Sequence, residues 1–278
     1  MVNEFQSNPR FALGSICLIV VFVVAITSIF WLPHNPNMMD IEDRFSGFTK
    51  EHLLGTDQYG RDELSRILVG ARKALMVGLI AVSIGAGFGI LFGSIASISN
   101  SGLQDLVMRA MDAIYSIPAI LLALLITTIL GPGIKNSIIA IGIFNIPVFA
   151  RLSRSSMISI KEEEYIIAAK SSGATNLHII LTHMLPNAAS PLIIQGSNSF
   201  ARALLAEAGL SYLGLGTQPP NASWGIMLKS AQTFAGQAPH LVIVPGLSIV
   251  FTVFAFNIFA DGLRDMFDPY SSYNYTGE

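Results

Sequence analysis

The chain has 278 residues, of which 52% are hydrophobic and 12% are charged, and its formal net charge at pH 7 is −2. Soluble domains carry about 25% charged residues, so this composition excludes an ordinary soluble protein and predicts an all-α integral membrane protein held in lipid. The slightly negative charge gives no basic field that would attract nucleic acid. A single cysteine, Cys17, excludes a disulfide framework and a thiolate metal cluster.

The first apolar segment runs from residue 11 to residue 32 without a charge. The apolar core of a cleavable signal peptide is about 7–15 residues long, so this longer run predicts a retained transmembrane helix. Four further uncharged runs predict spans at 74–98, 113–130, 136–150 and 241–260. A sixth span is predicted at 188–210, where polar residues interrupt the run.

Glycine and proline residues inside these runs predict how the helices pack and where they bend. Glycines recur at every fourth position in 85–93, which places them on one helix face and lets another backbone approach closely. Three prolines remove helix hydrogen bonds and predict kinks within the spans: Pro118, Pro147 and Pro245.

The run 188–210 carries four polar side chains, Gln195, Asn198, Arg202 and Glu207. Ionisable groups at membrane depth usually face a bundle interior or a wet cavity, because lipid does not solvate them. These residues therefore predict a translocation pathway or a subunit interface. The alternative is that the long side chains snorkel to the membrane surface near the helix end.

Residues 165–187 predict two short helices joined at Gly173, with Thr175 as the N-cap of the second helix and Pro186 at its end. The bend is built almost entirely of small residues, which allows it to sit deep in a groove on another protein. One apolar face is predicted on the second helix, formed by Leu177, Ile180, Leu181 and Met184.

Two further segments have distinctive patterns. Residues 52–75 combine turn chemistry with a helix that begins near Asp62 and Glu63, and this predicts an interfacial helix ahead of the second span. Its apolar face comprises Leu64, Ile67, Leu68, Ala71 and Leu75. Residues 207–225 are rich in Gly and Pro and predict an irregular loop, with Trp224 as an interfacial anchor.

These three segments resemble signatures of the permease subunits of ABC importers. Ala168, Ala169, Gly173 and the pair at 185–186 match the EAA loop, although Ile167 occupies the position of the namesake Glu. The strings HLLGTD, GRD and SR in 52–66, and LSYLGLG, PP and WG in 210–225, resemble the dipeptide, oligopeptide and nickel branch. Over residues 50–270 the chain resembles its C-type permease subunit.

The resemblance implies a type I ABC importer permease fold of about six transmembrane helices, with a cytoplasmic EAA coupling helix. It implies an N-terminal helix, extracytoplasmic segment and interfacial helix at 1–73, a permease domain at 74–270 with its EAA loop at 156–187, and a tail at 271–278. A bacterial inner membrane, both termini in the cytoplasm, and loops 33–73 and 209–240 outside are also implied.

The resemblance also implies a second permease, two cytoplasmic ATPases and an external solute-binding protein as partners. ATP and Mg belong to the ATPases, because this chain lacks a G-x-x-x-x-G-K-[ST] phosphate loop and is expected to bind no cofactor or metal and to catalyse nothing. The residues implied to couple to the ATPase are Tyr165, Ala168, Ala169, Ser172, Gly173, Ala174, Leu185 and Pro186. Those implied to contact the binding protein or form a gate are Gly55, Thr56, Asp57, Gly60, Arg61, Asp62 and Trp224.

Other functions compete with this interpretation. An ion-coupled secondary transporter would need no ATPase, but no internal repeat is visible. An intramembrane enzyme would need a motif such as H-E-x-x-H or G-x-S-x-G, and neither occurs. The five histidines are dispersed along the chain: His34, His52, His178, His183 and His240. Among importer substrates, small peptides, nickel or a metal chelate, and glutathione all remain open.

Overall fold

The computed structural model describes residues 8–267, and within that range it consists of helices and loops with one isolated β-bridge, between Thr56 and Asp62. The predicted tail at 271–278 lies outside the described residues. Four helices are long and apolar enough to cross a membrane: α2 (Pro9–Phe30), α3 (Glu63–Ile98), α6 (Ile134–Lys161) and α12 (His240–Phe267).

Two bent helix pairs bring the number of candidate spans to as many as six. In the first pair, α4 (Ser101–Tyr115) meets α5 (Ala119–Leu130) at 85°. In the second pair, the segment Asn176–Asn187 meets α10 (Ala189–Leu213) at 64°. That segment comprises α8 (Asn176–Ile179), the π-helix η1 (Ile180–Met184) and α9 (Leu185–Asn187).

The span predicted at 113–130, with a kink at Pro118, is broken at that proline. The chain leaves α4 after Tyr115, and Pro118 takes the N-cap position of α5. A proline disfavours helical geometry in the residue before it and has no N–H to continue the ladder, so the helix ends there and does not merely kink. Pro147 and Pro245 lie inside α6 and α12, as predicted.

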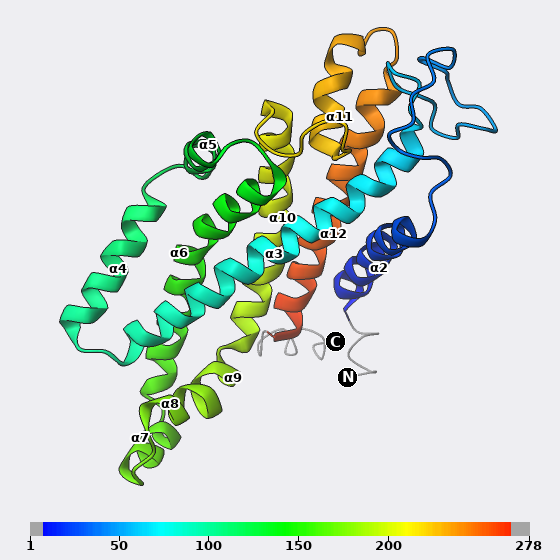
Figure 1. Cartoon of the computed structure of the whole chain (residues 1–278). Helices are drawn as coiled ribbons and strands as arrows, with labels where there is room; N and C mark the ends of the chain where they lie inside the picture. Colours follow the sequence, from blue (N-terminus) through cyan, green and yellow to red (C-terminus); the bar gives the residue numbers. More distant parts are fainter. Residues whose placement is uncertain (1–7, 268–278) are drawn as a thin grey trace.

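The helices form an elongated bundle around α3, which runs diagonally through it (Figure 1). One end, here called the loop end, carries residues 33–62 and the short helices α11 (Trp224–Ala231) and η2 (Gln232–Phe234). The opposite end, the elbow end, carries α7 (Glu164–Ser171) and α8. The start of α2 and the end of α12 lie toward the elbow end.

The predicted glycine stripe packs α3 against α6. A Cβ on Gly89 would lie 2.5 Å from Phe149 Cβ, and Cβ atoms on Gly85 and Gly93 would collide with Asn145 and Ser153. Real Cβ atoms do not approach other atoms this closely, so only glycine allows the observed separation of the two helices.

Glycines also allow α2 and α12 to cross in close contact. A Cβ on Gly14 would lie 2.5 Å from the backbone nitrogen of Phe259, and one on Gly262 would lie 2.5 Å from Phe11 Cα. Residues from α2 also enter the main hydrophobic cluster with α3, α10, α11 and α12. The first span is therefore an integral part of the bundle.

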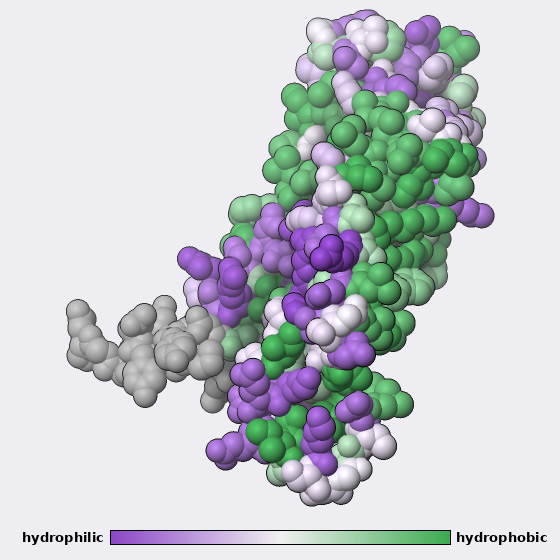
Figure 2. All heavy atoms as spheres, turned by 90° about the vertical axis from the view of Figure 1, so that its left-hand side faces the viewer, coloured by the Kyte–Doolittle hydropathy of each residue, from purple (hydrophilic) through white to green (hydrophobic). Residues whose placement is uncertain are grey.

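Large hydrophobic side chains remain exposed along the length of the helices, including Ile19 at 60%, Ile129 at 73% and Val250 at 63%. Figure 2 shows hydrophobic side chains over much of the upper part of one face, with hydrophilic ones at the top and toward the bottom. This distribution suits helices that satisfy their own backbone groups and face lipid.

Candidate functional site

The elbow end has the predicted helix, glycine bend and helix. Gly173 has φ +86°, a left-handed conformation that glycine adopts without strain. Two hydrogen bonds close the end of α7: Ala174 N donates to Ala169 O, and Gly173 N donates to Lys170 O. This pairing is a Schellman motif. Thr175 Oγ1 then accepts from His178 N, which confirms Thr175 as the N-cap of α8.

Buried apolar side chains anchor this bend to the end of α6. Ile166, Ile179, Ile180 and Met184 pack around Met157, whose side chain is fully buried. The bend is therefore packed against α6 and does not hang from a loose linker. A rigid connection of this kind is needed if displacement at the elbow is to reach the membrane helices.

Part of the predicted apolar face is wrong. Ile180 and Met184 are buried, but Leu177 and Leu181 are 65% and 57% exposed. The segment Ile180–Met184 is a π-helix, in which each turn holds more residues than in an α-helix. Residues that would share one face of an α-helix therefore point in different directions here. The segment ends at Asn187, one residue after Pro186, and the chain bends there by 64° before α10 begins at Ala189.

The predicted coupling residues lie at or near the surface. Tyr165, Ala168, Ser172, Gly173 and Pro186 are exposed. Ala169, Ala174 and Leu185 are half-buried. With Ile167 at 56% exposure, Leu177 and Leu181, they present apolar groups around a bend of small residues, and exposed apolar patches of this kind mark interaction surfaces.

At the loop end, Asp57 organises a buried ionic network. Its carboxylate accepts from Arg61 Nη2 at 2.6 Å and Arg61 Nε at 2.7 Å, while Arg66 Nε lies 3.7 Å away. The backbone nitrogens of Tyr59 and Arg61 also donate to it. Burying charges without such partners is costly, so these contacts hold the turn that leads into α3.

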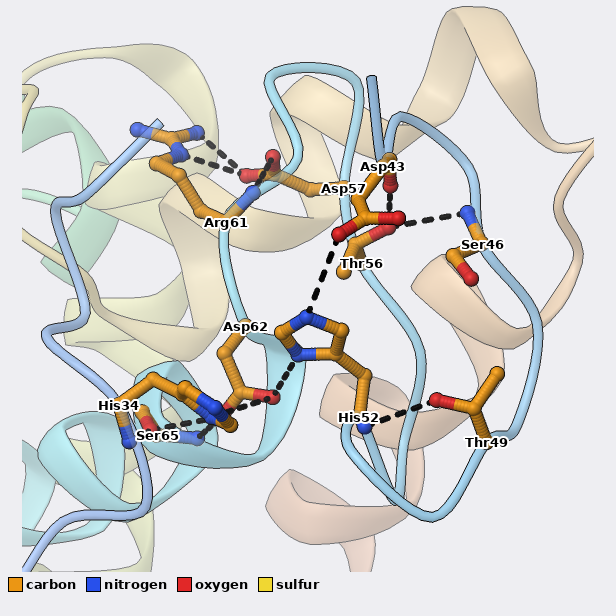
Figure 3. A network of polar contacts seen from close by, with 10 residues as sticks. All are labelled: His34, Asp43, Ser46, Thr49, His52, Thr56, Asp57, Arg61, Asp62 and Ser65. Carbon is orange, nitrogen blue, oxygen red and sulfur yellow. Dashed lines mark hydrogen bonds and ion pairs between the residues drawn. The ribbon is translucent and has the colours of Figure 1, made fainter. Parts of the chain in front are cut away.

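Asp62 is the N-cap of α3 (Figure 3). Its Oδ2 accepts from Ser65 N and Oγ, and His52 Nδ1 lies 2.9 Å from its Oδ1. Burial by itself would raise the pKa of Asp62, but the hydrogen bonds from Ser65 and His52 hold the pKa below its ordinary value. Thr56 ties the same loop together, since its Oγ1 donates to Asp43 O and accepts from Ser46 N.

The residues predicted to contact the binding protein or to form a gate lie mostly inside the loop end, which does not suit a contact surface and leaves the gate as a prediction. Six of these residues are buried within the loop itself and form its framework: Gly55, Thr56, Asp57, Gly60, Arg61 and Asp62. The predicted interfacial helix is also not separate, because α3 continues from Glu63 to Ile98 without a break and its early residues Ile67, Leu68 and Ala71 are buried.

Trp224 is not an interfacial anchor. Its side chain is 4% exposed, and its Nε1 donates to Ile67 O at 3.1 Å. It begins α11, with Ser223 as the N-cap, at the end of the stretch 207–225 that was predicted to be irregular, and the first part of that stretch, 207–213, is also helical because α10 continues to Leu213. An indole packed against Gly70 thereby joins the second long loop to the start of α3.

The structure separates the polar residues of α10. Gln195 and Arg202 both donate to Ser199 Oγ, at 2.9 and 3.4 Å, and Arg202 is exposed. Glu207 is 3% exposed and accepts from Ser211 Oγ at 2.6 Å and Thr217 Oγ1 at 3.3 Å. Glu207 therefore braces the turn after α10 and does not line a pathway. Gln195, Asn198 and Arg202 stay predictions for a pathway or interface.

An apolar groove of about 380 Å³ lies beside this part of α10. It is lined by residues from α3, α6, α9 and α10, including Val82, Ala86, Phe149, Pro186 and Ile193. The groove thus connects the elbow segment with the membrane helices. Sequence reasoning missed it because its walls are contributed by segments more than 100 residues apart.

Residues 85–272 match the family model of the binding-protein-dependent transport system inner membrane component. This chain belongs to that family. The DppC dipeptide transport system permease protein of Alkalihalophilus pseudofirmus is 44% identical over 267 residues, which are 96% of this chain and 86% of that protein. The GsiD glutathione transport system permease protein of Escherichia coli O157:H7 is 40% identical over 96% of this chain and 88% of its own length.

Solved structures of this permease class share the fold. The MetNI methionine ABC transporter in an inward-facing conformation aligns with a TM-score of 0.62 at 18% identity, over 73% of this chain and 97% of the matched chain. An amino acid ABC transporter aligns with a TM-score of 0.55 at 18% identity, over 70% and 91%. The predicted ABC importer permease fold is confirmed, and the chain is a membrane-embedded permease subunit.

Proposed function

We propose that this permease imports small peptides and forms the translocation pathway together with a second permease. The full-length similarity to a dipeptide permease at 44% identity carries this proposal, because it extends well beyond the short motifs. An external binding protein delivers the peptide, and two cytoplasmic ATPases bind ATP and Mg and drive the cycle. This chain itself binds neither and catalyses no reaction.

The exposed elbow is the proposed contact with one ATPase. Small residues at Ala168, Ser172 and Gly173 allow the bend to enter a groove, and Leu177 and Leu181 supply apolar area for burial there. When the ATPases close on ATP, they draw the two elbows together. The packing of Ile166 and Met184 on Met157 passes this movement to α6, and the cavity then opens to the other side.

The proposed orientation places the elbow end and both termini in the cytoplasm of a bacterium. The start of α2 and the end of α12 lie toward the elbow end in Figure 1, in agreement with an even number of crossings. Proteolysis of right-side-out vesicles tests this orientation. Cleavage confined to 33–62 and 214–239 supports it, whereas cleavage within 162–175 from the outside contradicts it.

The docking proposal is tested with Gly173→Trp. The indole fills the bend, so the ATPase is expected to be lost from the purified complex while the chain still folds in the membrane. Gly236→Trp is the matched control, because its position at the loop end also has open space around it. Wild-type ATPase association and transport by Gly173→Trp would show that the elbow is not the docking surface.

Gly173→Asn separates bulk from backbone conformation. Asn tolerates the left-handed conformation and adds little volume, so this variant is expected to keep most ATPase binding.

Transport by the wild-type chain alone, without any ATPase, would contradict the importer proposal and support an ion-coupled carrier.

Glutathione is the second substrate to test, since GsiD is 40% identical over 96% of this chain. Competition between a labelled dipeptide, glutathione and a nickel chelate in reconstituted vesicles distinguishes the three. Stimulation of uptake by the dipeptide's binding protein is the expected result.

A further inference from the structure

His34, His52 and Asp62 meet at the loop end although they are far apart along the chain (Figure 3). His34 follows α2, His52 lies within the loop, and Asp62 caps α3. One ligand atom from each lies within 4.8 Å of the other two. The distance from Asp62 Oδ1 is 2.9 Å to His52 Nδ1 and 3.7 Å to His34 Nδ1, and the imidazole centroids are 4.7 Å apart.

The internal contacts of the loop leave one of the three ligand atoms, His34 Nδ1, without a partner. The Asp62 side chain is 1% exposed and that of His52 is 12% exposed. His34 Nδ1 is buried and has no hydrogen-bond partner, because 3.7 Å is too long for a hydrogen bond to Asp62. A buried polar atom without a partner is unfavourable, and a bound ion is one way to satisfy it.

Neighbouring contacts hold the three residues in place. Ser65 engages Asp62 Oδ2 through both its backbone nitrogen and its hydroxyl, which leaves Oδ1 directed at the histidines. The backbone nitrogen of His34 donates to the same Ser65 hydroxyl at 3.0 Å. On the far side of the His52 ring, Asp43 Oδ2 lies 4.0 Å from Nε2, where a carboxylate can orient a metal-bound imidazole.

We propose that His34, His52 and Asp62 bind a divalent transition-metal ion of the zinc type. Two imidazole nitrogens and one carboxylate oxygen are donors that Zn²⁺ uses, whereas Mg²⁺ and Ca²⁺ prefer oxygen ligands alone. Ligand atoms about 2.0–2.1 Å from a tetrahedral zinc lie roughly 3.3 Å from one another. The separations of 2.9 and 3.7 Å lie on either side of that value. A zinc ion bound by these three residues keeps its fourth position open.

Metal binding would join the end of α2 and the middle of the loop to the first turn of α3. The ion therefore acts as a clamp on residues 33–62. This role is independent of the substrate and of ATPase docking, so it can fail while the proposed import function stands.

Zinc itself is the probe. The full chain is purified in detergent with an affinity tag free of histidine, stripped with a chelator and titrated with Zn²⁺ in competition with a chromogenic chelator. One zinc per chain is expected for the wild type. His34→Gln and Asp62→Asn are expected to weaken binding about tenfold or more. Asn can still cap α3, and the His34 ring makes no hydrogen bond through Nδ1, so both variants are expected to fold.

His240→Gln is the matched control, since His240 lies at the loop end but outside the cluster and is expected to leave zinc affinity unchanged. Co²⁺ gives a second readout: the intense visible absorption of tetrahedral cobalt is expected in the wild type and lost in His34→Gln. The proposal is overturned if stripped wild type takes up no zinc, or if His34→Gln and Asp62→Asn bind it as wild type does. The imidazole centroids of His178 and His183 lie 5.9 Å apart at the elbow end. Loss of zinc binding in His178→Gln would place the site there and would also overturn the proposal.

Discussion

Gly89→Ala tests whether the glycine stripe sets the distance between α3 and α6. The new Cβ would lie 2.5 Å from Phe149 Cβ and 2.6 Å from Ile146 O. Carbon atoms in contact are normally about 3.5–4.0 Å apart, so the two helices must separate locally by roughly 1 Å. Overpacking of this kind costs about 1–3 kcal/mol, and the separation would disturb the neighbouring contacts of Gly85 and Gly93.

Replacing glycine with alanine inside a helix also favours the helix by about 1 kcal/mol, which partly conceals the clash. Gly87→Ala is the control for this gain in helix propensity. Gly87 lies on the same helix and has nothing within 4 Å of its Cβ position, so this variant gains the helix term without the clash. The propensity term cancels between the two variants. Gly89→Ala is therefore expected to be about 1–3 kcal/mol less stable than Gly87→Ala.

Unfolding of the purified chain by SDS in detergent micelles, followed by circular dichroism, measures this difference. Thermal loss of monodisperse protein in size-exclusion chromatography gives an independent ranking. Equal stability of the two variants would refute the argument, because α6 would then be free to move away from α3 without cost.

Three further substitutions test other contacts, each by the same unfolding assay. Trp224→Phe removes the hydrogen bond to Ile67 O and is expected to destabilise the chain by about 1–3 kcal/mol, whereas Trp31→Phe, at an exposed position, is expected to be neutral; equal effects would contradict the anchoring role of α11. Asp57→Asn leaves the buried Arg61 and Arg66 without their carboxylate and is expected to cost about 3–5 kcal/mol, against about 0–1 kcal/mol for Asp112→Asn in the more exposed pair with Arg151. Gly14→Leu is expected to push α2 away from α12 at a cost of about 1–3 kcal/mol and to expose 33–62 to protease, while Gly246→Leu, in open space on α12, should do neither.

Local sequence signals predicted the parts of the molecule that depend on near neighbours. Long uncharged runs gave α2, α3, α6 and α12 because a helix in lipid must satisfy its own backbone and needs little else. The bend at Gly173 and the cap at Thr175 were also predicted, since both rest on hydrogen bonds a few residues apart.

Predictions failed where a local rule met a tertiary contact. By α-helical spacing Leu181 would share a face with Met184, but the π-helix Ile180–Met184 turns Leu181 toward the surface while Met184 stays buried. Trp224 has the composition of an interfacial anchor, yet it fills the space left by Gly70, far away in the sequence. Hydropathy cannot distinguish a buried indole from one at the membrane surface, because both have the same chemistry.

The sequence by itself determined that this protein is a helical membrane permease, because apolar length and short spaced motifs are local properties. Only the tertiary structure decided which polar groups meet. It turned Glu207 toward its own turn, buried Asp57 with two arginines, and brought His34 and His52 to Asp62. The physical reason is that Asp62 meets His52 and His34, which lie 10 and 28 residues earlier, only because of the way the loop folds back on α3, and no periodicity along the chain encodes that path.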